Sequence, residues 1–330
     1  MGCSLTDNVT LALAPLRGVT QLSFRQCLQA HFGGFDYAVS PFLTTVAGVR
    51  IKPTHLADIL PEANKTLPVV PQIIGKNPEE FRTLLLAIRD LGYERCDLNA
   101  GCPWPMIIKK GRGAGLMRDG DNLRRMLDAG CDVFPDGLSV KVRLGVDRPD
   151  LLVERMAIFN DYPLAELTIH ARTARQRYEG QVDLDAFAAA FALSKAPVVY
   201  NGDIRTAGDL TFLRRRFPTV KAWMIGRGAA VDPALASRIR GVKTDHYLQR
   251  LRAFVDDYDA RTRAELFGPA SFLGRMKEFW SYLHGVFAMG DALWRELRRS
   301  RSYAEYDDLL ARFWESSPVI SLPSSSLPVH

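Results

Sequence analysis

The stretch GLSVKVRLGVDRPDLLVERMAIFNDYPLAELTIH, residues 137–170, contains one complete repeat of the pattern that decides the fold. It begins with an apolar run at 137–143, typical of a strand buried on both faces, and a second such run follows at 164–170. Between them, residues 149–160 carry apolar side chains at helical spacing. A strand, a helix and another strand in this order predict a βαβ unit with parallel strands.

The same repeat continues in both directions along the chain. Six further strands, which bring the total to eight, are predicted at 9–14, 36–40, 68–74, 95–99, 197–201 and 220–225. Further helices are predicted at 20–31, 77–91, 121–130, 183–194, 206–217 and 232–240, whereas 41–67 is long and irregular. Eight strands alternating with helices over about 240 residues predict a (β/α)8 TIM barrel. Doubly wound α/β folds are the alternative, but no G-x-G-x-x-G follows the first strand.

The end of the chain follows a different pattern. Residues 272–287 and 303–314 have apolar side chains at helical spacing without intervening strands. We therefore predict two domains, a barrel at residues 1–242 and a small all-helical domain at 243–330. The last stretch, SSPVISLPSSSLPVH at 316–330, is rich in Ser and Pro and is expected to be flexible.

Composition excludes several classes of protein. The 330 residues are 47% hydrophobic and 24% charged, as in soluble globular proteins, and no run approaches the roughly 18 apolar residues of a membrane span. The start MGCSLT matches a short myristoylation pattern, but it has no apolar signal core and the remaining chain is typical of a soluble enzyme. Five cysteines without a C-x-x-C pair indicate a reducing compartment, and six scattered histidines indicate no metal site.

The charge is mildly basic and unevenly distributed. The formal net charge is +6, yet residues 243–330 hold twelve Lys and Arg against twelve Asp and Glu, so the surplus lies in the barrel. A basic barrel is compatible with a polyanionic partner.

Polar residues and glycines gather at the predicted strand ends, where a barrel carries its active site. In chain order these ends are Ala14-Pro15-Leu16, Ser40-Pro41, Gln72, Asn99 with Cys102, Lys141 with Arg143, His170 with Arg172, Asn201-Gly202-Asp203 and Gly226-Arg227-Gly228. Glycine turns after the last two strands are typical of a phosphate site, and Arg227 adds a charged donor. The residue types predict a phosphorylated cofactor or substrate beside a lysine, a histidine and a cysteine.

Six motifs in order resemble the tRNA-dihydrouridine synthase family. They are ALAPLRGVT (12–20), LNAGCPWPMIIKKGRGAGLM (98–117), SVKVRLG (139–145), IHARTARQRYEGQVD (169–183), YNGDI (200–204) and MIGRGA (224–229). The resemblance covers 9–240, whereas the helical tail is similar only in kind. Dihydroorotate dehydrogenases and other FMN barrels share a similar cysteine or serine loop but nothing resembling HARTARQRYEG.

The resemblance implies an oxidoreductase that reduces the 5,6 double bond of uridine in tRNA with FMN, using NADPH as reductant and Cys102 as general acid. The implied FMN contacts are Pro15, Leu16, Gln72, Lys141, His170, Asn201, Gly202, Asp203, Gly226 and Arg227. The implied RNA contacts are Asn99, Arg172 and Arg112, with Arg295, Arg298, Arg299 and Arg301 in the tail. The enzyme is expected to be a cytoplasmic monomer without a metal or a membrane anchor.

The sequence leaves three other functions possible. The same chemistry could serve ribosomal RNA or a small pyrimidine, and a protein of this kind could bind RNA without catalysis. The basic barrel and the helical tail favour an RNA substrate. Cys102, Lys141 and His170 together favour an enzyme.

Overall fold

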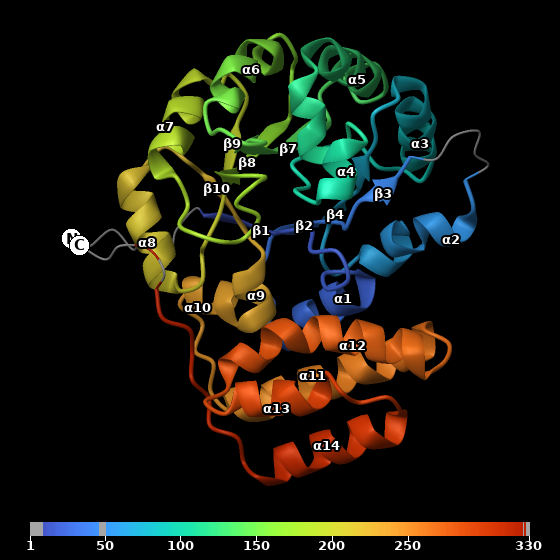
Figure 1. The fold of residues 1–330 in the computed structure, drawn as a ribbon, viewed down its shortest axis with the longest axis vertical. Coiled ribbons are helices and arrows are strands. Elements are labelled where there is room, and N and C mark those ends of the chain that lie inside the picture. Colours follow the sequence, from blue (N-terminus) through green and yellow to red (C-terminus); the bar gives the residue numbers. More distant parts are fainter. Residues whose placement is uncertain (1–8, 46–50, 326, 328–330) are drawn as a thin grey trace.

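The computed structural model describes residues 9–45, 51–325 and 327; the myristoylation pattern at the start lies outside them. A curled parallel sheet is surrounded by helices, with a layer of further helices packed below it (Figure 1). The strands are β1 (Thr10–Leu13), β2 (Tyr37–Val39), β3 (Leu43–Thr44), β4 (Val69–Val70), β5 (Gln72–Ile74), β6 (Cys96–Ala100), β7 (Leu138–Gly145), β8 (Glu166–Thr173), β9 (Val198–Asn201) and β10 (Ala222–Ile225).

The helices alternate with these strands and then continue without them. They are α1 (Leu22–His31), α2 (Pro53–Leu56), α3 (Pro78–Asp90), α4 (Pro105–Lys109), α5 (Gly120–Val133), α6 (Leu151–Asn160), α7 (Leu184–Leu193), α8 (Ala207–Arg216), α9 (Arg227–Val231), α10 (Leu235–Ile239), α11 (Tyr247–Glu265), α12 (Pro269–Leu283), α13 (Gly290–Leu297) and α14 (Tyr303–Glu315). Short 3₁₀ turns lie at Ala57–Ile59, Pro61–Asn64, Gly113–Arg118 and His284–Val286.

The sheet closes on itself at the predicted strand 68–74. Its order is β3-β5-β6-β7-β8-β9-β10-β1-β2-β4. Pro71 has no N–H for the ladder and separates β4 from β5, while β3 continues the line of β2. Ala38 of β2 pairs with Val69 of β4, and Leu43 of β3 pairs with Ile73 of β5. The strands at the two ends of the order, β3 and β4, therefore belong to two neighbouring chain segments, 37–44 and 69–74, which pair with each other. Eight segments therefore make one closed barrel, which confirms the predicted TIM barrel.

Local signals in the sequence set the starts of two helices. The Asn77 side chain accepts the N–H groups of Glu79 and Glu80 ahead of α3. Thr206 and Asp209 form a reciprocal capping box at the start of α8. The helix predicted at 232–240 is shorter in the structure, where α10 spans Leu235–Ile239, and the additional short helix α9 precedes it.

Two apolar layers hold the barrel together. The larger fills the space between strands and helices. The smaller consists of Ala12, Ala14, Tyr37, Val39, Val70, Val199 and Met224, with Ala222 packed against it. Since alternate strand residues face opposite sides, these side chains fill the barrel interior below its mouth.

Helices α11 to α14 form the lower layer in Figure 1, and the proposed domain boundary after residue 242 falls between α10 and α11. The contact with the barrel is aromatic: the Phe24 ring of α1 lies 5.7 Å from that of Phe254 on α11 and 6.3 Å from that of Phe279 on α12. Such edge-on aromatic packing makes a well-ordered joint. No helix within 9–45, 51–325 and 327 has the length and apolar character needed to span a membrane.

The Ser/Pro-rich end does not extend into solvent over 316–325. It runs from α14 back up to α8 (Figure 1). Its backbone pairs with the short segment that follows α12, since Ala288 N–H donates to the Val319 carbonyl (2.9 Å) and Ser321 N–H donates to the Val286 carbonyl (2.7 Å). Ile320 packs on the core, and these contacts order a segment that its composition alone predicts to be flexible.

Candidate active site

A cavity of about 1070 Å³, partly open to solvent, lies at the C-terminal ends of the barrel strands. Most of the predicted site residues line it, namely Pro15, Leu16, Asn99, Cys102, Lys141, His170, Asn201, Gly202, Asp203, Gly226 and Arg227. Gln72, Arg112 and Arg172 are not among the lining residues.

The Cys102 loop is held by the preceding strand end. The Asn99 side-chain oxygen accepts the N–H of Gly101 (3.1 Å) and of Cys102 (2.8 Å). A Cβ at Gly113, whose φ is +55°, would lie 2.7 Å from the Cys102 Cβ, so only glycine lets the next segment pack so closely. Burial raises the pKa of the Cys102 thiol, which keeps the proton on sulfur at neutral pH.

Gln72 supports this loop from below. Its Nε2 donates to the Asp97 carboxylate (2.7 Å), and its Oε1 accepts from Asn99 Nδ2 (2.8 Å). Ser139 Oγ donates to the other Asp97 oxygen (2.9 Å). A hydrogen-bonded chain therefore runs from Asp97 through Gln72 and Asn99 to the Cys102 backbone. Burial raises the pKa of Asp97 to about 6, although the bonds from Gln72 and Ser139 oppose this rise.

A lysine and an asparagine bridge two strand ends across the cavity. Lys141 Nζ donates to Asn201 Oδ1 (2.8 Å), and Asn201 Nδ2 donates to the Met224 carbonyl (2.8 Å). Burial and the nearby Arg143 charge lower the pKa of Lys141 to about 7. Burial and the surrounding cations hold the pKa of His170 well below its usual value, so this imidazole is neutral.

Three buried or half-buried arginines hold the end of β8 and the loop that follows it, residues 173–180, by their carbonyl groups. Arg143 donates to the carbonyls of Thr173 (2.9 Å) and Arg177 (2.7 Å). Arg172 donates to those of Glu179 and Gly180, and Arg227 donates to that of Tyr178 (3.2 Å). The guanidinium groups thus fix a loop that has little regular structure of its own.

Asp203 neutralises part of this cluster. Arg172 binds both of its carboxylate oxygens (3.0 and 2.5 Å) and Arg227 binds one (2.7 Å). Burial alone would raise the pKa of Asp203, but these arginines bring it below its usual value. The Arg172 side chain is 1% exposed, so the structure gives it an internal position and does not present it to RNA.

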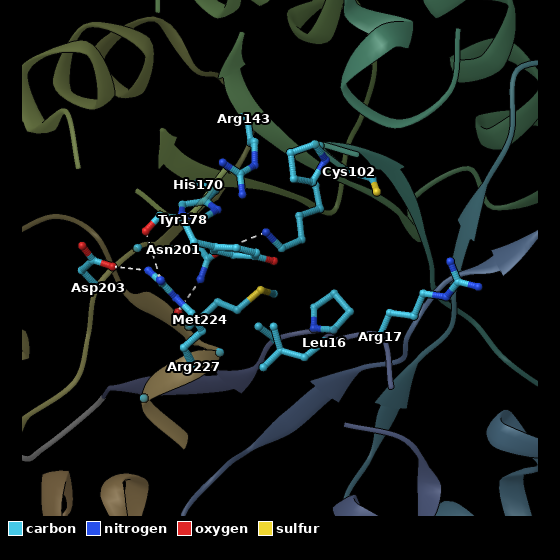
Figure 2. A pocket seen from close by; sticks show the side chains of 18 of the residues that line it. Leu16, Arg17, Cys102, Arg143, His170, Tyr178, Asn201, Asp203, Met224 and Arg227 are labelled. Atoms are coloured by element: carbon cyan, nitrogen blue, oxygen red, sulfur yellow. Dashed lines mark hydrogen bonds and ion pairs between the residues drawn. The ribbon is translucent and has the colours of Figure 1, made fainter. Parts of the chain in front are cut away.

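Tyr178 projects into the middle of the cavity, between Arg143 and His170 on one side and Arg227 and Met224 on the other (Figure 2). The guanidinium carbons of Arg143 and Arg227 lie 5.4 and 4.7 Å from the centre of its ring. Cations on an aromatic face are stabilising, so the ring position is well determined.

Several lining residues were not assigned from the sequence. They are Arg17, Phe42, Trp104, Arg143, Tyr178, Met224, Arg205, Glu278 and Tyr282. Five of them lie inside the quoted motifs and could have been found from them, namely Arg17, Trp104, Arg143, Tyr178 and Met224. Glu278 and Tyr282 come from α12, and no local pattern indicates that this helix reaches the barrel mouth.

The lining of the cavity suits a phosphorylated flavin by its apolar wall and its charge. Pro15, Leu16 and Met224 supply an apolar wall, and a Cβ at Gly226 would approach Ala14 to 3.3 Å, which keeps that turn tight. Cationic side chains outnumber the carboxylates among the lining residues, which suits an anionic ligand. No group of three or more His, Cys, Asp and Glu side chains suited to a metal ion is found in the described ranges.

Comparison with solved structures finds enzymes that share this barrel fold. Morphinone reductase superposes with a TM-score of 0.53 at 12% identity, covering 71% of this chain and 86% of that one. The old yellow enzyme homologue of Zymomonas mobilis gives 0.53 at 12% identity over 72% and 92% of the two chains. At this identity the likeness shows the fold alone. The class of the protein, a flavin-dependent oxidoreductase, follows from its family.

Sequence comparison gives the family. The model of the dihydrouridine synthase (Dus) family matches residues 12–266, so the chain belongs to the dihydrouridine synthase family. It is 29% identical to the tRNA-dihydrouridine(16) synthase of Cupriavidus necator over 91% of this chain and 96% of that protein. It is 28% identical to the enzyme of the same name from Pseudomonas putida, again over 91% and 96%.

Proposed function

We propose that this protein reduces uridine in tRNA to dihydrouridine, with FMN as cofactor and NADPH as reductant. The observation that carries the proposal is the buried, protonated thiol of Cys102, fixed by Asn99 at the cationic mouth of a barrel of the dihydrouridine synthase family. We further propose that it acts as a monomer in the cytoplasm, where tRNA and NADPH are available.

The reaction adds a hydride to one carbon of the uracil 5,6 double bond and a proton to the other. Bound FMN, once reduced by NADPH, supplies hydride chemistry at this site. Cys102 is the general acid: its Sγ gives up the proton, and the resulting thiolate takes one back from solvent. The raised pKa of the buried thiol keeps the proton on Sγ at neutral pH, so that it is present when the reaction needs it.

The chain's own residues divide the cofactor site into three parts. Pro15, Leu16 and Met224 would pack against the ring system. Lys141 and His170 supply a titratable cation and a neutral donor beside it. The backbone turns at Gly202–Asp203 and Gly226–Arg227 would hold the phosphate, with Arg227 contributing charge. Gln72 is proposed as a further cofactor contact. Gln72 and Arg172 also position two lining residues, since Gln72 binds Asn99 and Arg172 binds Asp203.

The uracil faces Asn99 and the Cys102 loop. Asn99 Oδ1 is already used by two N–H groups, while its Nδ2 donates one proton to Gln72 and keeps a second for a uracil carbonyl. A uridine stacked in tRNA cannot reach this depth, so the nucleotide must be extruded. The cationic rim, with Arg112 and the tail arginines as proposed outer contacts, would bind phosphates in a salt-dependent way.

Position 16 of tRNA is our proposed target, because the relatives named above carry that position in their names. The test compares nucleosides from purified tRNA and rRNA of cells with and without the gene by mass spectrometry, followed by mapping. Loss of dihydrouridine at position 16 of tRNA is the expected result. Loss from rRNA alone would change the partner, and no loss from either RNA would refute the proposal.

A further inference from the structure

Trp104 is exposed at the entrance of the cavity. It is 53% exposed, whereas Trp223 and Trp280 are fully buried. It lines the same cavity as Cys102, two residues away along the chain. Exposing a large aromatic surface to water is unfavourable, so its place beside a reactive thiol points to a ligand.

The backbone around Trp104 is rigid. Pro103 and Pro105 flank it and restrict its rotation. Its carbonyl accepts the N–H groups of Ile107 (2.9 Å) and Ile108 (3.0 Å) at the start of α4, which lies inside the ring of α3 and α5 (Figure 1). The indole is thus carried by a fixed support, so little conformational entropy is lost when a ligand stacks on it.

Arg177 lies against the indole from a different part of the chain. Its guanidinium carbon is 5.6 Å from the ring centre. Its backbone has φ +50°, a left-handed conformation rare for a non-glycine residue, and its carbonyl is held by Arg143 (2.7 Å). No ion pair to Arg177 occurs among the residues that the structure describes. Its charge remains available to an external anion.

The surroundings favour a nucleic acid over another protein surface. Met106, two residues from Trp104 along the chain, and Tyr178, next to Arg177, are also exposed, at 68% and 38%. Exposed cations follow at Lys109, Lys110 and Arg175. Aromatic platforms interleaved with cations are the means by which proteins bind unpaired strands, since every base has a face to stack and a phosphate beside it.

We propose that Trp104 and Arg177 form a stacking subsite for the unpaired RNA base next to the uridine that enters the cavity. This inference rests on the proposed function and adds a second nucleotide contact to it. Trp104 and Cys102 are separated by at most about 7.6 Å between Cα atoms, because consecutive Cα atoms are 3.8 Å apart. Adjacent nucleotides of one strand can therefore occupy the two positions, and the stacked neighbour helps keep the target uridine extruded.

The first test is kinetic and uses the full-length flavin-loaded protein with tRNA. Trp104→Ala is expected to raise KM for tRNA by roughly 5- to 150-fold, as for loss of a base stack. Trp104→Phe keeps an aromatic face and should restore most of the affinity. KM for NADPH should stay within twofold of the wild-type value. The matched control is Phe267→Ala, which removes a fully exposed aromatic side chain that does not line the cavity.

The second test is spectroscopic. Because Trp104 is the exposed indole, its stacking on a base should quench part of the tryptophan fluorescence when tRNA binds. That quenching should disappear in Trp104→Phe although the RNA still binds. An unchanged KM for tRNA in Trp104→Ala would overturn the proposal, as would an equal loss in Phe267→Ala. A rise in KM for NADPH alone would assign the platform to the dinucleotide instead.

These outcomes are separable from failure of the proposed function. A wild-type protein that forms no dihydrouridine and binds no tRNA would remove the premise. A wild-type protein that forms dihydrouridine while Trp104→Ala matches it in KM and quenching would remove only this inference.

Discussion

Replacing Gln72 with leucine should slow uridine reduction by disconnecting Asp97 from the Cys102 loop. The side chain is fully buried and of similar volume to leucine, so the main change is chemical. Two hydrogen bonds disappear, the 2.7 Å bond to Asp97 and the 2.8 Å bond from Asn99. Asn99 then has no fixed orientation on that side, while its oxygen still faces the N–H groups of Gly101 and Cys102.

The magnitude follows from the bonds involved. Leaving two buried polar groups without partners costs about 1–3 kcal/mol each, so the free energy of unfolding should fall by about 2–6 kcal/mol. If Asn99 reorients, the loop loses two N–H···O bonds worth about 0.5–1.5 kcal/mol each. A loss of about 1–3 kcal/mol in positioning the thiol corresponds to a kcat lower by roughly 5- to 150-fold.

The assay combines three measurements on one preparation. The kcat at saturating tRNA should fall, and iodoacetamide should modify Cys102 faster, because the loop that shields this buried thiol loosens. Alkylation of the half-buried Cys131, resolved by mass spectrometry, is the internal reference. Flavin content per protein should stay unchanged.

The control variant is Ser139→Ala. It also removes one bond to Asp97, of 2.9 Å, but leaves the connection to Cys102 intact. Equal effects of Gln72→Leu and Ser139→Ala on kcat and on Cys102 alkylation would refute the reasoning. A loss of flavin with unchanged Cys102 reactivity would instead favour the direct cofactor contact proposed for Gln72.

Three further predictions test the rest of the site. With the Lys141 pKa near 7, the protonated form is lost as pH rises, so FMN should bind the flavin-free protein more weakly from pH 7 to 9, by at most about tenfold per unit. A fluorescence titration should show this slope in the wild type and none in Lys141→Met. Arg172→Met leaves Asp203 in a buried ion-pair site with one strong partner fewer and should cost about 3–5 kcal/mol in a denaturant titration. Cys102→Ser should lower kcat by about 10²–10⁴-fold. Reduction of the flavin by NADPH should keep its rate in this variant. That step is followed at 450 nm (about the flavin absorption maximum) under anaerobic stopped-flow conditions.

Residues at the ends of strands show how far local sequence reaches. Lys141, His170 and Asn201 occur at the ends of apolar runs, and the closed barrel brings all three to one cavity, as the repeat predicts. The same pattern predicts a cavity position for Gln72, but Pro71 interrupts the strand just before it. It is therefore the first residue of β5, in register with Asp97, and its amide is used inside the fold.

The sequence by itself determined the alternation of strands and helices, and with it the barrel, its mouth and the cysteine loop there. This was possible because strand and helix periods, caps and turns depend on residues a few positions apart. Only the tertiary structure decided that Arg172 forms an ion pair with Asp203 and that Arg177 lies against the Trp104 ring. It also decided that α12 brings Glu278 and Tyr282 to the cavity. These contacts join segments up to 270 residues apart in the chain, and their partners are chosen by packing and charge in three dimensions, which no local period encodes.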